Sequence, residues 1–424
     1  MRADLFSYDR HTLLVIQEGV CHVTFSSLGG AGVVARRLHE GQLKNESKSR
    51  LVTMTNRNIK ALTLSQPTLV AKALVDFYGV RRTTQSHLFT LYRNGSNSGV
   101  QNAILNTREL LHFHWTPGVV SNSDLAWYAH SQRGAVWTLH DMWPFTGGCH
   151  HARDCSNYEQ NCSECPQVRA VFKHKVVKNL ALKTESLRSG AGLYVVAPSQ
   201  WLASRISASR VLKNAVVNVI PNPIDCAVFS PGDKQLARQH FQISPGAFVI
   251  GCSAVDLGDP MKNTKAIVDG VRRFAASIDG KEVVLLAVGV GVIKHPGFQV
   301  CNTGVMDSSK KMSVAYQAMD VFVSLSRAES FSLTVAEATA TGVPVICISN
   351  GGMPEIVSDG ENGRVIAEDE LLCGVLNEFV ADPLQMTKMS KLGRQKALQT
   401  FSQELVVSEY DRVYEQVVGE RDGR

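Results

Sequence analysis

The stretch that decides the fold runs from residue 321 to residue 349 and reads VFVSLSRAESFSLTVAEATATGVPVICIS. It begins with an apolar run at Val321–Ser326, continues with a helical pattern over Thr334–Thr341, and ends with a second apolar run at Val343–Ser349. Two short apolar runs with a helix between them are typical of a β-α-β unit, whose parallel strands are buried on both faces. The stretch therefore predicts a parallel sheet covered by helices.

The same alternation recurs on both sides of this unit. In the second half, further strands are expected at Phe248–Ser253, Glu282–Gly289 and Phe298–Asn302, and further helices at Thr264–Ala276 and Lys310–Ala318. In the first half, strands are expected at Val20–Phe25, Arg50–Thr55, Glu109–Trp115, Ala135–His140 and Leu193–Pro198, with a helix at Val33–Leu43. A chain of 424 residues exceeds the roughly 250–300 at which a single core stops growing. We therefore expect two α/β domains, 1–222 and 223–400, joined at a proline-rich linker.

The composition is that of an ordinary globular protein, with 44% hydrophobic and 19% charged residues. The longest apolar run, Val283–Ile293, is about half the ~20 residues that span a bilayer. Near the N-terminus, Asp4 and Glu18 flank a run, Leu13–Ile16, that is too short for a signal peptide. We therefore expect a cytoplasmic protein that does not bind nucleic acid.

Two carboxylates mark the candidate site. Glu329 follows the strand Val321–Ser326 in a turn, where ligands of parallel sheets bind, and Glu337 lies inside the next helix. Between them, the backbone N–H groups at positions 330–332 open a helix N-terminus, which attracts anions. Carboxylates accept hydrogen bonds from neighbouring hydroxyls. The pattern therefore favours a ligand that combines a sugar, a ribose and a diphosphate.

The spacing Glu329-x7-Glu337, followed by Gly342-Val-Pro344-Val-Ile, resembles the retaining glycosyltransferases of family 4, which have the GT-B fold. Further matching motifs, in the same order as in that family, are the glycine turn at 29–32, Trp137-Thr-Leu-His140-Asp141, Ala197-Pro-Ser-Gln-Trp201, Val219-Ile-Pro-Asn222-Pro-Ile-Asp225 and Gly351-Gly352-Met-Pro354-Glu355. The resemblance covers about residues 20–415. The segment His140–Pro166 is most similar to bacterial enzymes that build exopolysaccharides such as colanic acid.

The resemblance implies two Rossmann-like, doubly wound domains that face each other across a cleft. The first, 1–222, would bind the acceptor, and the second, 223–400, the nucleotide sugar. A last helix, 401–418, would pack back on the first domain. The implied reaction moves a sugar, with retention, from a UDP- or GDP-sugar to a saccharide or lipid-linked saccharide. It needs no cofactor and no catalytic metal, and the chain accordingly has no Asp-x-Asp motif.

The resemblance also assigns roles to single residues. Glu329 would hold the donor sugar, Glu337 the ribose, Lys262 the diphosphate, and His140 would lie beside the transferred sugar. The remaining donor-binding positions are Gly30, Gly32, Lys265, Ser330, Phe331, Ser332 and Gly352. Acceptor-binding positions are expected at His114 and Trp143, because aromatic faces stack on sugars.

One departure from the family concerns the diphosphate. Members usually carry an arginine five or six residues before the lysine, and here Val255, Asp256 and Leu257 stand in that region. Either Lys265 supplies the second positive charge, or the leaving group is stabilised less than usual. Ser332 also stands where glycine is common.

Other functions remain open at this point. A dinucleotide-dependent oxidoreductase fits Gly30-x-Gly32-x-x-Ala35 loosely, but the segment Arg50–Asn56 lacks the acidic residue of that fingerprint. A nucleotide-sugar epimerase, a phosphorylase or a catalytically silent binding protein on the same fold are further alternatives.

Two segments allow two interpretations each. The four cysteines Cys149, Cys155, Cys162 and Cys165 either bind a structural zinc ion, with His150 and His151 as additional ligands, or form a loop of buried or reactive thiols. The basic stretch Val171–Arg188 predicts a helix that either lies on the inner face of a membrane near a lipid-linked acceptor or is an ordinary surface helix.

Overall fold

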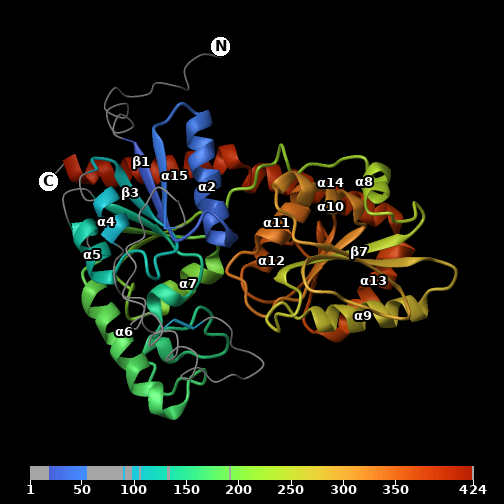
Figure 1. The fold of residues 1–424 in the computed structure, drawn as a ribbon, viewed down its shortest axis with the longest axis horizontal. Helices are drawn as coiled ribbons and strands as arrows, with labels where there is room; N and C mark the ends of the chain where they lie inside the picture. The colour runs from blue at the N-terminus through green and yellow to red at the C-terminus, as the bar shows by residue number, and fades with distance from the viewer. Residues whose placement is uncertain are drawn as a thin grey trace. The chain divides into compact units, whose positions relative to one another are not determined.

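The computed structural model describes residues 19–54, 89–90, 98–104, 107–130, 134–190 and 192–422. The chain forms two compact units (Figure 1). The first contains Met1–Pro223 and Val406–Arg424, and the second contains Ile224–Leu405. The boundary therefore lies one residue from the expected one. The N-terminal residues that bear on a signal peptide lie outside the described residues.

The first unit is a six-stranded parallel sheet in the order β2-β1-β3-β4-β5-β6. Its strands are β1 (Val20–Thr24), β2 (Ser49–Thr53), β3 (Leu110–Phe113), β4 (Ala135–Thr138), β5 (Leu193–Ala197) and β6 (Val216–Val219). Its helices are α2 (Gly29–Lys44), α4 (Ser98–Ile104), α5 (Asn122–His130), α6 (Lys173–Leu187) and α7 (Gln200–Ala208). The strand β6 was not expected, because this edge strand is only partly buried and lacks a strong apolar pattern.

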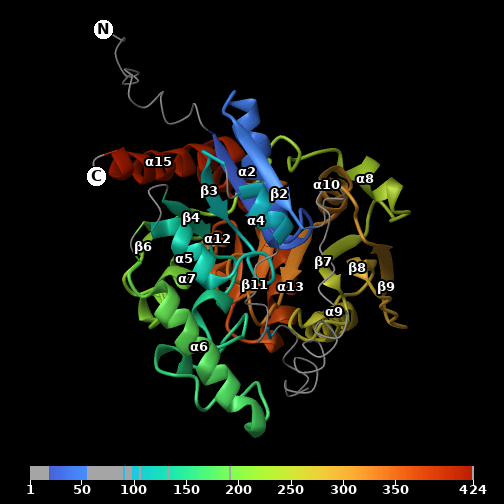
Figure 2. The same ribbon diagram turned by 60° about the vertical axis from the view of Figure 1, so that its left-hand side comes forward.

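The last helix, α15 (Gln403–Asp422), closes the first unit. Figure 2 shows it beside β3 and β4. The Tyr410 hydroxyl lies 2.9 Å from the Thr138 hydroxyl, and the Tyr414 hydroxyl lies 2.8 Å from Nδ1 of His112. These contacts tie the end of the chain to β3 and β4.

The second unit repeats the architecture with the sheet order β12-β11-β10-β7-β8-β9. Its strands are β7 (Phe248–Asp256), β8 (Val283–Val290), β9 (Gln299–Gly304), β10 (Val321–Ser324), β11 (Val345–Ile348) and β12 (Gly363–Ile366). Its helices are α8 (Lys234–His240), α9 (Thr264–Ser277), α10 (Ser309–Ala318), α11 (Leu333–Ala340), α12 (Met353–Ile356), α13 (Leu372–Ala381) and α14 (Pro383–Thr400). Two apolar clusters form its core, and residues of both come from the same central strands.

The strand order reverses once in each sheet. In the second unit the reversal falls between β7 and β10, so the loops that follow these two strands flank a topological switch point, where open α/β sheets bind ligands. In the first unit it falls between β1 and β3. The predicted α/β class with two doubly wound parallel sheets is confirmed.

Candidate active site

An ion pair occupies the switch point of the second unit. Lys262 comes from the loop after β7 and Glu329 from the loop after β10, and the ammonium nitrogen lies 2.5 Å from Oε1 of the carboxylate. The backbone ties the two loops together, because the Met261 carbonyl accepts hydrogen bonds from the Arg327 amide (2.8 Å) and the Ser326 hydroxyl (3.3 Å). The charge of Glu329 raises the pKa of Lys262, so the lysine carries its positive charge at neutral pH.

Two glycines pack against the backbone carbonyl of Glu329. The Gly352 amide donates a hydrogen bond to the Glu329 carbonyl at 3.0 Å. Gly351 has a φ of +64°, and a Cβ atom on it would lie 1.9 Å from the same carbonyl oxygen. Only glycine allows this approach, since any side chain would push the loop that carries Glu329 away. The motif Gly351-Gly352 therefore positions the carboxylate without touching it.

The turn that follows Glu329 leads directly into α11. Ser332 precedes the helix with a φ of +86°, a conformation that glycine adopts freely and serine does not. This explains why glycine is the common residue there. The Phe331 ring is buried and packs edge-on against Phe401, with 5.7 Å between ring centroids. Phe331 thus anchors the turn in the core, and only its backbone is placed to meet a ligand.

Glu337 lies on the inner side of α11. It is buried, and the hydroxyl of Tyr316 on α10 donates a hydrogen bond to Oε2 at 3.3 Å. A buried carboxylate with a hydroxyl donor is a suitable partner for the paired hydroxyls of a ribose. The joint role of the two glutamates in holding one donor stays a prediction.

The two candidates for a second positive charge are placed differently. Lys265 is 89% exposed on the surface of α9, and its ammonium pairs with Asp269 at 2.7 Å. Arg327 lies in the loop of Glu329, and its guanidinium reaches Asn263 Oδ1 at 3.4 Å and Asp369 Oδ2 at 3.9 Å. Sequence reasoning missed Arg327, although its position two residues before Glu329 was a signal. The structure therefore favours Arg327 over Lys265 as the neighbour of Lys262.

The first unit contains a row of histidines, of which His22 and His114 are buried and His140 is partly buried. Gln42 Oε1 lies 2.8 Å from Nε2 of His22, whose Nδ1 lies 3.1 Å from Nε2 of His114. Nδ1 of His114 lies 3.1 Å from Nε2 of His140. His22, His114 and His140 come from β1, the end of β3 and the end of β4, so neighbouring parallel strands build the row.

The electrostatics keep these imidazoles neutral. Burial lowers the pKa of His22 and of His140 to about 4, and it lowers the pKa of His112 and His114 well below the ordinary value. Gln42 also hydrogen bonds to Asp411, which requires its amide N–H to face that carboxylate. Its carbonyl oxygen then accepts from His22, and each following histidine donates from Nε2 to Nδ1 of its neighbour. The row thus fixes the proton of His140 on Nε2.

These histidines are close enough together to hold a metal ion, since one nitrogen each of His22, His112 and His114 lie within 4.8 Å of one another. However, all six ring nitrogens of the three residues already have hydrogen-bond partners: Gln42, the neighbouring histidines, Thr138 and Tyr414. A metal ion would have to break this row, so the group fits a hydrogen-bond network better than a metal site.

The expected acceptor residues are enclosed. Trp143 is 1% exposed, its indole N–H donates to the Thr90 carbonyl, and the Lys183 ammonium lies 3.7 Å from its ring centroid. Its ring face is therefore already covered and would stack on a saccharide only after rearrangement. His114 is likewise buried within the histidine row. Both acceptor-binding roles stay predictions that this structure does not favour.

The glycine turn of the first unit opens α2. The residue before the helix, Leu28, offers no side-chain hydrogen bond to the first amides, and Gly30 is exposed there. A Cβ atom on Gly32 would lie 2.2 Å from the Ser26 carbonyl, so glycine lets the helix pack against the preceding turn. The N-terminus of this 16-residue helix is thus open to an anion.

The basic helix forms as α6 (Lys173–Leu187), preceded by a 3₁₀ turn at Ala170–Phe172. Val176, Leu180 and Leu187 are buried against the first unit. The protein itself therefore covers the apolar face with which a membrane-bound helix would insert. None of the helices in the described part of the chain combines the length and the apolar character that a membrane span requires.

Comparison with known proteins defines the class. Residues 297–396, which include Glu329, Glu337 and Gly352, match the glycosyl transferases group 1 family. The second unit therefore carries a group 1 glycosyl transferase domain, and the two doubly wound units have the GT-B fold.

Particular relatives agree with this assignment. Over 407 residues the chain is 24% identical to a protein of Escherichia coli (strain K12) named as the colanic acid biosynthesis glycosyl transferase WcaC, covering 91% of this chain and 96% of that protein. The sucrose-phosphate synthase of Thermosynechococcus elongatus superposes with a TM-score of 0.68 at 17% identity, over 95% of this chain and 99% of that one. HepE of Anabaena, solved with UDP and glucose, superposes with a TM-score of 0.60 at 16% identity, over 93% and 99%. The predicted GT-B fold and the similarity to colanic-acid-type glycosyltransferases are confirmed.

Proposed function

We propose that this protein is a retaining glycosyltransferase that moves a sugar from a UDP- or GDP-sugar to a saccharide or lipid-linked saccharide. The observation that carries the proposal is the Lys262–Glu329 ion pair at the switch point of a group 1 glycosyl transferase domain. The similarity to WcaC favours a place in bacterial exopolysaccharide synthesis.

The ion pair suits a nucleotide-sugar donor because its two partners match the two ends of such a ligand. A diphosphate would take over the ammonium of Lys262, and the sugar hydroxyls would donate to the released carboxylate of Glu329. Both charges thus keep a partner in the bound state. In the ligand-free protein, the pair holds both side chains at the site.

The leaving group gives Lys262 its role in the reaction. Breaking the bond between the anomeric carbon and the phosphate oxygen builds negative charge on the diphosphate, which a fixed cation stabilises. In the front-face displacement that the family resemblance implies, the acceptor hydroxyl forms its bond on the same face and its proton passes to the departing phosphate oxygen. Arg327 would add a second positive charge. The same resemblance places His140 beside the transferred sugar.

A panel of nucleotide sugars tests the proposal. Thermal shifts and donor hydrolysis are measured for the wild type, Glu337→Ala and Lys262→Ala, with Lys265→Ala as the control because that lysine pairs on the surface of α9. We expect one donor class to stabilise the wild type and Lys265→Ala but neither of the other two variants. A response to NAD(P), and to no nucleotide sugar, would overturn the proposal.

A further inference from the structure

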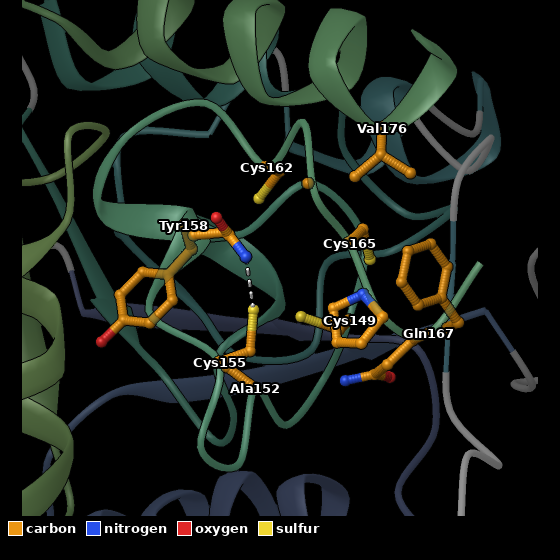
Figure 3. Close-up of a pocket in the computed structure, with 13 residues that line it drawn as sticks. Cys149, Ala152, Cys155, Tyr158, Cys162, Cys165, Gln167 and Val176 are labelled. Atoms are coloured by element: carbon orange, nitrogen blue, oxygen red, sulfur yellow. Dashed lines mark hydrogen bonds between the residues drawn. The ribbon is translucent and has the colours of Figure 1, made fainter. Parts of the chain in front are cut away.

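Four cysteines of the first unit converge on one small pocket. They lie in the loop between β4 and α6, and Figure 3 shows the side chains of Cys149, Cys155, Cys162 and Cys165 directed into the same space. No disulfide links any of the ten cysteines, all of which are described, so all four thiols are free. The rest of the pocket lining is mainly apolar, including Phe89 and Val176.

The four cysteines line the same pocket, although they are spread over 17 positions of the chain. Cys149, Cys162 and Cys165 are buried, and Cys155 is partly buried. One pocket therefore collects all four thiols of this loop.

The loop is mostly irregular. Between residues 146 and 169 its regular structure is one 3₁₀ turn, Asn157–Glu159, and an isolated bridge between Cys149 and Phe89. Cys162 has a φ of +59°, a costly conformation for a residue with a side chain, and its amide donates to the Asn157 carbonyl at 2.9 Å. Loops of this length with so little secondary structure are uncommon in compact domains and are usually functional. Four inward thiols offer a means of cross-linking this one.

A buried lysine borders the start of the loop. Lys183 of α6 is fully buried, and its ammonium donates to the carbonyls of Trp143 and Thr146. These contacts tie the first residue of the loop to α6.

We propose that Cys149, Cys155, Cys162 and Cys165 bind one structural zinc ion that cross-links the loop 146–168. A set of four sulfurs favours zinc in tetrahedral geometry, with Zn–S distances of about 2.3 Å, and leaves no open position for catalysis. His150 is not a ligand, because its two ring nitrogens bind Asp141 (2.8 Å) and Thr90 (2.9 Å). The loop begins a few residues after His140, so a bound zinc ion would fix the segment of chain that follows this histidine.

Metal analysis of the full chain, purified without chelator or added zinc, tests the proposal. We expect about one zinc ion per chain, release of that zinc by a mercurial reagent, and loss of it in Cys162→Ser and Cys165→Ser. Cys373→Ser, on α13 of the other unit, is the matched control and should keep the metal. Because the loop variants could fail to fold, cobalt(II) replacement in the wild type is the second measurement, with the visible absorption of a tetrahedral tetrathiolate as the expected result.

Three results would overturn the proposal. These are zinc far below one equivalent in folded wild-type protein, four loop thiols that react freely without chelator, or iron with the colour of an iron–sulfur cluster in place of zinc. None of these outcomes depends on transferase activity, so the zinc site and the proposed function can fail independently.

Discussion

The ammonium of Lys262 and the carboxylate of Glu329 form an ion pair at 2.5 Å although 67 residues separate them in the chain. The order of the strands explains this pairing. β7 and β10 are neighbours in the sheet, and both residues lie just beyond the carboxyl ends of these strands. The two side chains neutralise each other in the free protein. On binding of a nucleotide sugar, the cation could pair with the diphosphate and the anion could accept hydrogen bonds from the sugar.

Arg327 is expected to contribute to donor binding. Its guanidinium lies near Asn263, next to Lys262, and its backbone is bonded to the Lys262 loop. Arg327→Ala should raise the donor KM by about ten- to a hundredfold, because a charge-assisted contact to phosphate contributes roughly 1.5–3 kcal/mol. Steady-state kinetics with varied donor would measure it, with Arg364→Ala as a surface control that loses ion pairs to Asp359 and Glu378. An unchanged KM would assign Arg327 a purely structural role through Asp369.

Ser332→Gly should stabilise the second unit. Serine at a φ of +86° is strained, and glycine removes this strain. Glycine also gives the unfolded chain more conformational freedom, but this opposing effect is smaller than the strain. The net gain should be about 0.5–1 kcal/mol. The matched control is Ser330→Gly. Ser330 does not have a positive φ, so glycine at this position should lower the free energy of unfolding. Urea unfolding followed by circular dichroism would show both effects, and a loss of stability in Ser332→Gly would contradict the argument.

Gly351→Ala should displace Glu329 and abolish activity. The new Cβ would lie 1.9 Å from the Glu329 carbonyl oxygen, so the loop must move. Gly360→Ala is the matched control, since Gly360 also has a positive φ (+77°) but a Cβ atom on it would meet no other atom within 4 Å. We expect a cost of about 1 kcal/mol for the control and distinctly more for Gly351→Ala. Equal losses of unfolding free energy and equal activities in the two variants would show that the close approach of Gly351 to the Glu329 carbonyl does not matter.

The buried histidines predict a selective acid lability of the first unit. Their pKa values are lowered from 6.5, to about 4 for His22 and His140, so between these pH values the unfolded chain binds protons that the folded chain does not. Stability therefore falls as the pH falls through this window, by up to about 1.4 kcal/mol per pH unit for each histidine. Asp411, whose pKa is raised to about 6 by burial, acts in the opposite direction and offsets about one histidine.

Tryptophan fluorescence isolates this effect. All five tryptophans lie between residues 115 and 201, within the first unit. Urea midpoints followed by fluorescence should drop between pH 7 and pH 5 by more than midpoints followed by circular dichroism, which reports both units. A fluorescence midpoint that does not change with pH would mean that the histidines are not held neutral.

The sequence by itself determined the local units of this protein. The apolar runs and helical patterns fixed ten of the twelve strands to within about three residues, because burial on both faces leaves a continuous apolar signature. The spacing of Glu329 and Glu337 placed one carboxylate before α11 and the other within it. Strands β6 and β12 were missed because each has only four residues and is partly exposed at a sheet edge, where the apolar pattern fades.

Only the tertiary structure decided the partners across the chain. In the folded chain Lys262 pairs with Glu329, and Arg327 lies in the loop of Glu329, whereas Lys265 lies on the surface. His22, His114 and His140 form one hydrogen-bonded row. It also buried Trp143 under Lys183. Such contacts depend on which strands become neighbours and on where each loop turns. A local pattern of residue types carries no information on either, because strand order is set by the packing of the whole sheet.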